Sequence, residues 1–432
     1  MKNFRKHLSA QNYLRLTRHE FERIQDPRRD SQTKISLADA LMSALAMFGL
    51  KYPSLLEFDG ERNDPILQHN LKHLYGVNQV PCDTQMRTLL DPIAPAALHR
   101  AFNRIFTELQ RGKILERYRY LNDHYLVSVD GTGHFASSSI SCPECCSKQT
   151  RNGPLHYHQL LGAALVHPQQ HCVIPLPPEA IIKEDGQSKN DCERNAAKRL
   201  LPRLRRHHPH LKLIVVEDGL ASNGPHIRLL QELDLRYILV ANPGDHQALF
   251  KAFDACPRLA EFERQDEQGC LHGFRFADDL PLNETHPDIH VNLLEYWQVK
   301  EGKTLNFTWV TDLPLTPDTV FDVMRGGRAR WKIENETFNT LKNQGYHLEH
   351  NYGHGQQHLA TVFGQLTLLA FLIDQAQELC CPLFQAARAR YRTRVGLWKR
   401  LLSRFLEHRI TDWALLWRSI AEGVSLLRLD SG

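Results

Sequence analysis

The chain has 432 residues, a formal net charge of +4 and a mean hydropathy of −0.43. This length exceeds one ordinary core, so we expect about two to four structural units. There is no run of about 18 uncharged apolar residues, and no apolar core follows the charged residues 1–6, so we expect neither a membrane span nor a secretory signal. The ten cysteines are scattered, which predicts reduced thiols in the cytoplasm rather than a disulfide framework.

The positive charge is uneven along the chain. Residues 1–34 hold nine Lys or Arg against four Asp or Glu, and a second basic cluster spans residues 198–212. Residues 388–409 contain one acidic residue, Glu407, and eight basic residues: Arg388, Arg390, Arg392, Arg394, Lys399, Arg400, Arg404 and Arg409. Local basic surfaces on a nearly neutral chain suit a polyanion such as DNA. The alternative is a set of basic helices that only solvate the surface.

Residues 1–118 have the pattern of short helices. Leu37, Leu41 and Leu45 recur at helical spacing, and prolines divide the region. Several short helices in a basic region fit a helix-turn-helix-like DNA-binding unit, and they fit a plain helical bundle equally well.

From residue 119 the periodicity changes to that of an α/β sheet. We expect a core over residues 119–244, in which strands alternate with helices. The expected strands are 125–129, 157–166, 172–176, 211–217 and 236–241, and the expected helices are 189–206 and 225–233. Residues 245–312 alternate apolar and polar positions and predict a β-rich insertion. Helical patterns follow in residues 313–355, and again in the basic region 356–432.

Three carboxylates stand where a metal site would need them. Asp130 follows the β-branched apolar run 125–129, Asp218 follows the run 213–217, and a glycine comes after each. Glu334 lies in a helical stretch, with Arg330 one turn before it and Lys342 two turns after it. Carboxylates brought together by one sheet can hold Mg²⁺ or Mn²⁺ ions for phosphoryl transfer. Taken singly, each Asp-Gly could be a turn, and the helical group could be surface salt bridges.

A cysteine pair follows the first aspartate. Cys142, Cys145 and Cys146 precede His156, His158, His167 and His171, which is the spacing of a zinc knuckle. A structural Zn²⁺ is one interpretation, and a chance grouping beside the active site is the other. Three further histidines after Glu334, at positions 350, 354 and 358, could contact phosphate or a metal, or be ordinary polar residues of a loop and helix.

With these three carboxylates in this order, the chain resembles a DDE transposase of the bacterial insertion-sequence type. The most specific match is Arg330-Trp331-Lys332-Ile333-Glu334, and the resemblance spans about residues 120–355. It implies a ribonuclease-H-like mixed sheet with flanking helices, interrupted by a β-rich insertion, and Asp130, Asp218 and Glu334 as metal ligands. Two positions depart from the family's signature: Gly327 stands where a Tyr is frequent, and Leu341 stands where the signature Lys usually lies.

The resemblance also implies contacts with DNA. Arg330 and Lys342 would contact phosphates near the cut. Trp309 would stack on a flipped base, although a core Trp that packs the insertion is an equally good interpretation. Independently of the resemblance, the basic charge of residues 388–409 predicts that Arg390, Arg392 and Arg394 bind double-stranded DNA through its phosphates.

The sequence therefore predicts a DNA transposase that cuts and joins element ends. Its partners would be terminal inverted repeats and target DNA, and it would act as a homodimer in the bacterial cytoplasm, associated with the nucleoid. A ribonuclease-H-like nuclease or domesticated transposase without strand transfer is the first alternative. A non-enzymatic, zinc-containing DNA-binding protein is the second.

Overall fold

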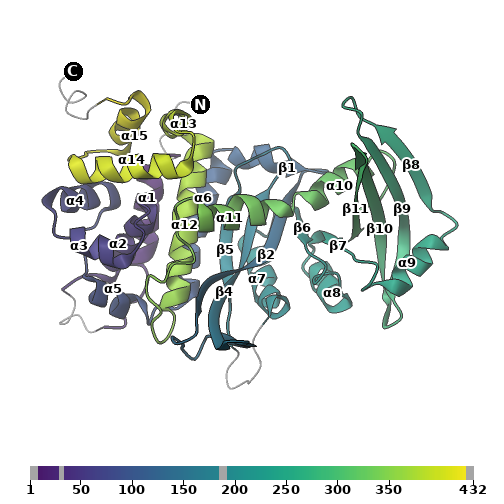
Figure 1. The fold of residues 1–432 in the computed structure, drawn as a ribbon, viewed down its shortest axis with the longest axis horizontal. Helices are drawn as coiled ribbons and strands as arrows, with labels where there is room; N and C mark the ends of the chain where they lie inside the picture. The colour runs from purple at the N-terminus through teal and green to yellow at the C-terminus, as the bar shows by residue number, and fades with distance from the viewer. Residues whose placement is uncertain (1–7, 29–33, 184–191, 425–432) are drawn as a thin grey trace.

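The computed structural model describes residues 8–28, 34–183 and 192–424. The most N-terminal basic residues, the start of the helix expected at 189 and the last eight residues lie outside the described residues. Three parts follow one another along the long axis in Figure 1: helices, a central sheet with its covering helices, and the insertion.

The N-terminal part consists of helices, as its periodicity predicts. They are α1 (Ala10–Glu22), α2 (Leu37–Gly49), α3 (Leu55–Glu61), α4 (Pro65–Asn70), η3 (Leu71–Tyr75), α5 (Asp83–Leu90), η4 (Pro95–Leu98), α6 (His99–Arg111) and η5 (Ile114–Tyr118). The side chains of Ser9, Ser36 and Ser54 cap the first turns of α1, α2 and α3. Nearly every residue of α2 is buried, because it packs against a long helix from the far end of the chain.

One mixed sheet joins the middle of the chain to the insertion. Its strands are β1 (Arg119–Tyr120), β2 (His124–Ser137), β3 (Cys146–Thr150), β4 (Gly153–Val166), β5 (Ile174–Ile181), β6 (Leu213–Glu217), β7 (Arg236–Val240), β8 (Ala260–Gln265), β9 (Leu271–Asn283), β10 (His286–Lys300) and β11 (Lys303–Thr311). Strands β5, β4 and β2 are antiparallel neighbours, and β6 and β7 continue the sheet in parallel. Helices α7 (Glu193–His207) and α8 (Gly224–Glu232) follow β5 and β6 in the chain. The predicted α/β class with a large mixed sheet is therefore confirmed.

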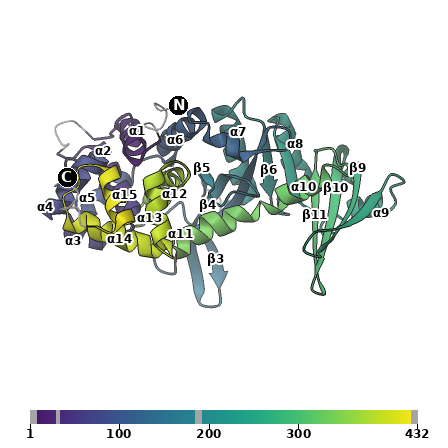
Figure 2. The ribbon, with the colours of Figure 1, turned by 90° about the horizontal axis from the view of Figure 1, so that it is seen from above.

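Strand β2 is longer than the sequence predicted. Its parallel pairing with β6 ends at Ser128, but its antiparallel pairing with β4 continues to Ser137. The prediction that the strand ends at Asp130 is wrong, because β4 supplies hydrogen-bond partners to β2 beyond that residue. The extended β4 also pairs with β3, and this hairpin projects from the body of the protein in Figure 2.

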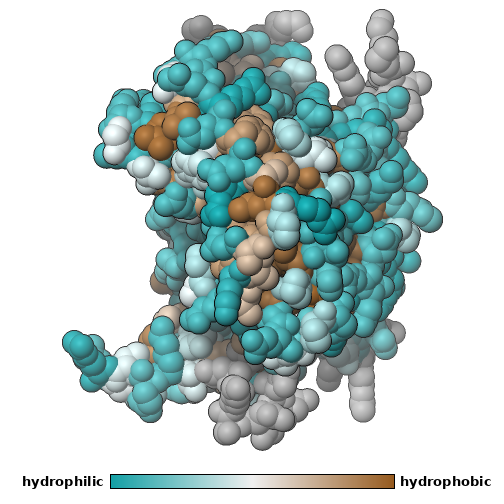
Figure 3. Space-filling view, turned by 90° about the vertical axis from the view of Figure 1, so that its right-hand side faces the viewer, coloured by the Kyte–Doolittle hydropathy of each residue, from teal (hydrophilic) through white to brown (hydrophobic). Residues whose placement is uncertain are grey.

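The insertion extends the sheet. After helix α9 (Gln247–Asp254), strands β8 to β11 form an antiparallel meander, and β11 pairs with β7. Seen from this end, apolar side chains form a band between hydrophilic ones (Figure 3). Large apolar side chains that are exposed include Leu305 on β11 and Phe321 on the helix α10 (Val320–Arg328) that follows the insertion.

The remaining helices return along the molecule. They are α10 (Val320–Arg328), η6 (Ile333–Phe338), α11 (Asn339–Asn343), α12 (Leu359–Cys380), α13 (Pro382–Arg390), α14 (Arg394–Glu407) and α15 (Trp413–Glu422). Helix α12 is long and apolar enough to cross a membrane, but all of its apolar window is buried within the protein. It contacts α2, α6 and β5, so it is a core helix between the N-terminal helices and the sheet.

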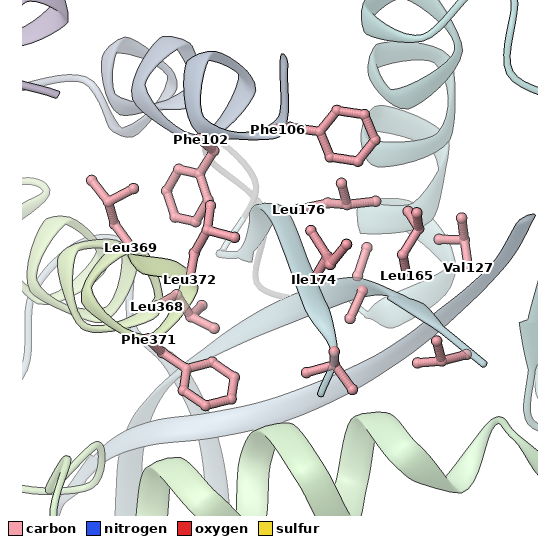
Figure 4. Close-up of a cluster of buried hydrophobic side chains, with 14 of the residues drawn as sticks. Phe102, Phe106, Val127, Leu165, Ile174, Leu176, Leu368, Leu369, Phe371 and Leu372 are labelled. Carbon is pink, nitrogen blue, oxygen red and sulfur yellow. The ribbon is translucent and has the colours of Figure 1, made fainter. Parts of the chain in front are cut away.

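The core between α6, α12 and the sheet is aliphatic and aromatic. Figure 4 shows Phe106 of α6 above Leu176 of β5, and Phe102 of α6 beside Leu369 and Leu372 of α12. This packing fixes the sheet against both helices, and with it the strand that carries Asp130.

Candidate active site

The pairing of two parallel strands brings the two aspartates together. Ser128 of β2 pairs with Val216 of β6, so the same register extended by two residues sets Asp130 beside Asp218. Both residues line one small cavity, of about 20 Å³. A cavity of this size has room for a water molecule or a small ion.

A helical segment brings the third carboxylate to the same strand. Arg330 Nη1 donates to Asp130 Oδ2 at 3.3 Å and to Glu334 Oε1 at 2.6 Å. Ser128 Oγ donates to the carbonyl oxygen of Arg330 at 2.8 Å, which fastens this segment to the face of β2 that also carries Asp130. The segment η6 has π-helical turns, which are rare and concentrate at functional sites.

A glycine on β4 lets η6 approach the sheet closely. Gly162 pairs with Asp130, and a Cβ on it would come within 2.9 Å of the Phe338 ring. A larger residue at position 162 would therefore push η6, and Glu334 with it, away from the aspartates.

The environment of Asp130 favours its neutral form. The pKa of Asp130 is raised to about 7, mainly by burial; the Gly131 amide and the Arg330 guanidinium oppose the rise, and nearby Glu334 contributes to it. The Gly131 N–H donates to Asp130 Oδ1 at 2.8 Å. A carboxyl group held near neutrality beside a second carboxylate is characteristic of sites that bind a cation or transfer a proton.

Further carboxylates, which the sequence did not single out, line the same cavity. Burial, and secondarily Asp218 and Glu217, raise the pKa of Glu193 at the start of α7. Glu217 Oε2 lies 2.6 Å from His226 Nε2. Glu193 is the first residue of α7 rather than the residue that closes an apolar run, so the pattern that points to Asp130 and Asp218 does not point to it.

Cysteines and histidines from two distant segments form a second cluster. Cys142, Cys145, His158 and His354 bring their sulfur and Nε2 atoms within 4.8 Å of one another, and such a group could hold a metal such as zinc. Cys146 was predicted as a ligand, and this is wrong because its buried thiol instead lies 3.7 Å from the Ile181 carbonyl oxygen. Strand alternation sends neighbouring side chains to opposite faces, which separates Cys145 from Cys146.

The other histidines of these segments lie outside this cluster. His358 Nδ1 pairs with Glu144 Oε1 at 2.8 Å, and His350 packs edge-on against Tyr352. The ring of His167 packs edge-on against Tyr120.

Trp309 is a core residue in this structure. Only 2% of it is exposed, its ring stacks on Phe307 with centroids 5.7 Å apart, and it lies under α10. The predicted base contact is therefore wrong, since a buried ring presents no face to a base. Its packing also explains Gly327, where a Cβ would come within 2.5 Å of Trp309 Nε1.

The exposed aromatic residue of this region is Trp331. Half of it is accessible, and it lies within the helical segment of Glu334 with the Arg330 guanidinium 5.8 Å from its ring centroid. Lys342, in α11, forms an ion pair of 2.8 Å with Glu349.

The C-terminal basic residues divide into two groups. Arg394 forms an ion pair of 2.7 Å with Glu378 and is mostly buried. Arg390 donates to the Ala421 carbonyl oxygen at 3.0 Å but is exposed, as are Arg392, Lys399 and Arg400. At the other end of the chain, Arg18 of α1 and Arg23, which follows that helix, are engaged in ion pairs. The number of basic residues therefore overstates the positive surface that these regions offer.

Comparison with known proteins assigns no family to the chain. No model of a protein family matches the chain, and no curated protein matches its sequence.

Proposed function

We propose that this protein is a DNA transposase that cuts and joins DNA ends by metal-dependent phosphoryl transfer. The observation that carries the proposal is the setting of Asp130. It lines a small cavity together with Asp218, and the Arg330 guanidinium that donates to it also donates to Glu334. The strand order supports it: three antiparallel strands followed by two parallel strands is the arrangement expected of a ribonuclease-H-like core.

The residues present fit divalent cations. A positive charge already occupies the place where the carboxylates meet, since the Arg330 guanidinium bridges Asp130 and Glu334. The donors are carboxylate oxygens, which Mg²⁺ and Mn²⁺ prefer. Asp130, Asp218 and Glu334 would hold the ions. When bound, such ions activate the attacking oxygen and neutralise the leaving oxygen.

The protein's own residues prepare this chemistry. Asp130 must give up its proton before it can bind a cation, and the Gly131 amide and Arg330 favour its charged form. If Asp130 and Glu334 held a cation, the Arg330 side chain that now contacts both would be available to a DNA phosphate. Exposed Trp331 and the exposed basic residues of α14 lie on surfaces that a DNA duplex can reach.

The test is cleavage of linear DNA that carries the sequences flanking the gene, in Mg²⁺. Glu334→Gln, Asp130→Asn and Asp218→Asn should each abolish cleavage and leave DNA binding, measured by fluorescence anisotropy, nearly unchanged. Glu336→Gln is the matched control, because Glu336 lies two residues further along the same segment. The Glu336→Gln protein should cleave DNA normally. Normal cleavage by Asp218→Asn would overturn the assignment.

A second assay separates transposition from simple cutting. Pre-cleaved ends with a 3′-hydroxyl should be joined to target DNA by the wild-type protein. Cleavage without joining would instead indicate a nuclease on the same fold.

A further inference from the structure

The Cys142, Cys145, His158 and His354 side chains are arranged as four ligands around one point. The two sulfurs are 3.8 Å apart. His158 Nε2 lies 3.4 Å from Cys142 Sγ and 3.3 Å from Cys145 Sγ. His354 Nε2 lies 3.2 Å from Cys145 Sγ and 3.1 Å from His158 Nε2.

These separations match the edges of a zinc tetrahedron. Zinc binds thiolate sulfur at about 2.3 Å and imidazole nitrogen at about 2.0–2.1 Å. A regular tetrahedron with such bonds has edges of about 3.8 Å between sulfurs, about 3.6 Å between sulfur and nitrogen, and about 3.3 Å between nitrogens. The five separations above agree within about 0.4 Å, and the sixth, from Cys142 Sγ to His354 Nε2, is at most 4.8 Å. A small movement of side chains would remove such deviations.

The surroundings orient the ligands. The Gly355 carbonyl oxygen lies 3.0 Å from His354 Nδ1, so the ring donates there and its Nε2 lone pair points to the sulfurs. The Phe135 ring packs on His354 with centroids 4.5 Å apart. Cys145, His158 and His354 are each at most 7% exposed, which shields the point from water.

We propose that Cys142, Cys145, His158 and His354 bind one structural Zn²⁺. Two thiolates and two imidazoles are the donors that zinc prefers over magnesium. Four protein ligands leave no open position for substrate, so the ion is structural rather than catalytic. This proposal is independent of the proposed function.

The zinc fastens the chain beyond Glu334 to the sheet that carries Asp130. His354 follows α11, whereas His158 lies on β4 four residues from Gly162, the partner of Asp130. Four strand residues span about 13 Å, so the clamp is close to the active site without entering it. The ion pair of Glu144 with His358 joins the same two segments. If the proposed function holds, zinc is a positioning element for Glu334.

The test is the metal content of the full-length protein purified without added metal or chelator, measured by inductively coupled plasma mass spectrometry. We expect one zinc per chain in the wild type and near-complete loss in Cys145→Ser and His354→Gln. Cys146→Ala is the matched control, because it removes the adjacent buried thiol and should retain zinc. Reconstitution with Co²⁺ should give the intense visible absorption of a tetrahedral site with thiolate ligands.

The outcomes are distinct from those of the cleavage assay. The proposal is overturned if the wild-type protein contains no zinc and gives no tetrahedral Co²⁺ spectrum. It is also overturned if the Cys145→Ser protein retains its full zinc content. If the Cys145→Ser protein does not fold, two other measurements decide: the zinc content of Cys142→Ser, which changes a half-buried residue, and the zinc content of the wild type. Zinc content is measured without DNA, so failed cleavage leaves this result intact.

Discussion

Arg330 and Asp130 are 200 residues apart in the chain, and their side chains meet, with Arg330 Nη1 3.3 Å from Asp130 Oδ2. The same nitrogen lies 2.6 Å from Glu334 Oε1. One guanidinium is therefore shared by two carboxyl groups of the candidate site. A metal ion at this point would compete with Arg330 for the same oxygens.

Replacing Arg330 should therefore have opposite effects on stability and on metal binding. In Arg330→Gln we expect the free energy of unfolding to fall by about 1.5–3 kcal/mol in chelator, because charged hydrogen bonds are lost. Mn²⁺ affinity, measured by isothermal titration calorimetry without DNA, should increase because a competing charge is gone. Arg328→Gln is the control: Arg328 is exposed and donates to Gln298, so neither quantity should change much. Weaker Mn²⁺ binding by Arg330→Gln would contradict this account.

Metal affinity should depend on pH through Asp130. Its pKa of about 7 lies above that of an unfolded carboxyl, so the folded protein holds this proton until the pH exceeds about 7. Binding a cation expels the proton, so Mn²⁺ affinity should fall about tenfold for each pH unit below 7. Asp130→Asn should bind weakly, with a much flatter pH profile. An affinity that stays constant between about pH 5.5 and 7 would exclude Asp130 as a ligand.

The raised pKa of Asp130 also makes the stability of the fold depend on pH. Because the folded pKa is raised, Asp130 makes its largest favourable contribution when protonated, and stability is lost as pH rises from the unfolded value towards about 7. Chemical denaturation in chelator should show this loss in the wild type. Asp130→Asn should reduce the loss, since an amide does not titrate.

Two tryptophans should respond in opposite ways to truncation. Trp309→Ala should lower the free energy of unfolding by about 3–5 kcal/mol, because a buried aromatic side chain leaves a cavity. Trp331→Ala, at a half-exposed position, should change it by less than about 0.5 kcal/mol. Urea denaturation of both variants measures this. A fully stable Trp309→Ala protein would contradict the core role of Trp309.

The basic surface of the C-terminal region should control the salt dependence of DNA binding. Each phosphate contact contributes about 0.9 to the slope of log affinity against log salt. Replacing Arg392, Lys399 and Arg400 together by Gln should reduce that slope by up to about 2.7.

Arg394→Gln is the contrasting variant. It breaks the ion pair with Glu378, so it should lower stability and leave the slope nearly unchanged. An unchanged slope in the triple variant would show that this surface faces away from DNA.

The sequence by itself determined the elements and the chemistry available to them. Short continuous apolar runs predicted β2, β6 and β7, and the helical periodicity predicted the N-terminal and C-terminal helices. The residue type and local setting of Asp130, Asp218 and Glu334 are readable in a short window of sequence. These are local properties of the chain, so no knowledge of distant contacts was needed.

Only the tertiary structure decided which residues meet. Strand β2 extends past Asp130 because β4 pairs with it, and Trp309 is covered because α10 packs over it at Gly327. His354 replaces Cys146 beside Cys145 because the chain after α11 returns to the β3–β4 hairpin. Arg394 is withdrawn from the basic surface by Glu378 on α12. Each outcome depends on a partner from a distant part of the sequence, and such pairing is set by packing and burial that no local pattern records.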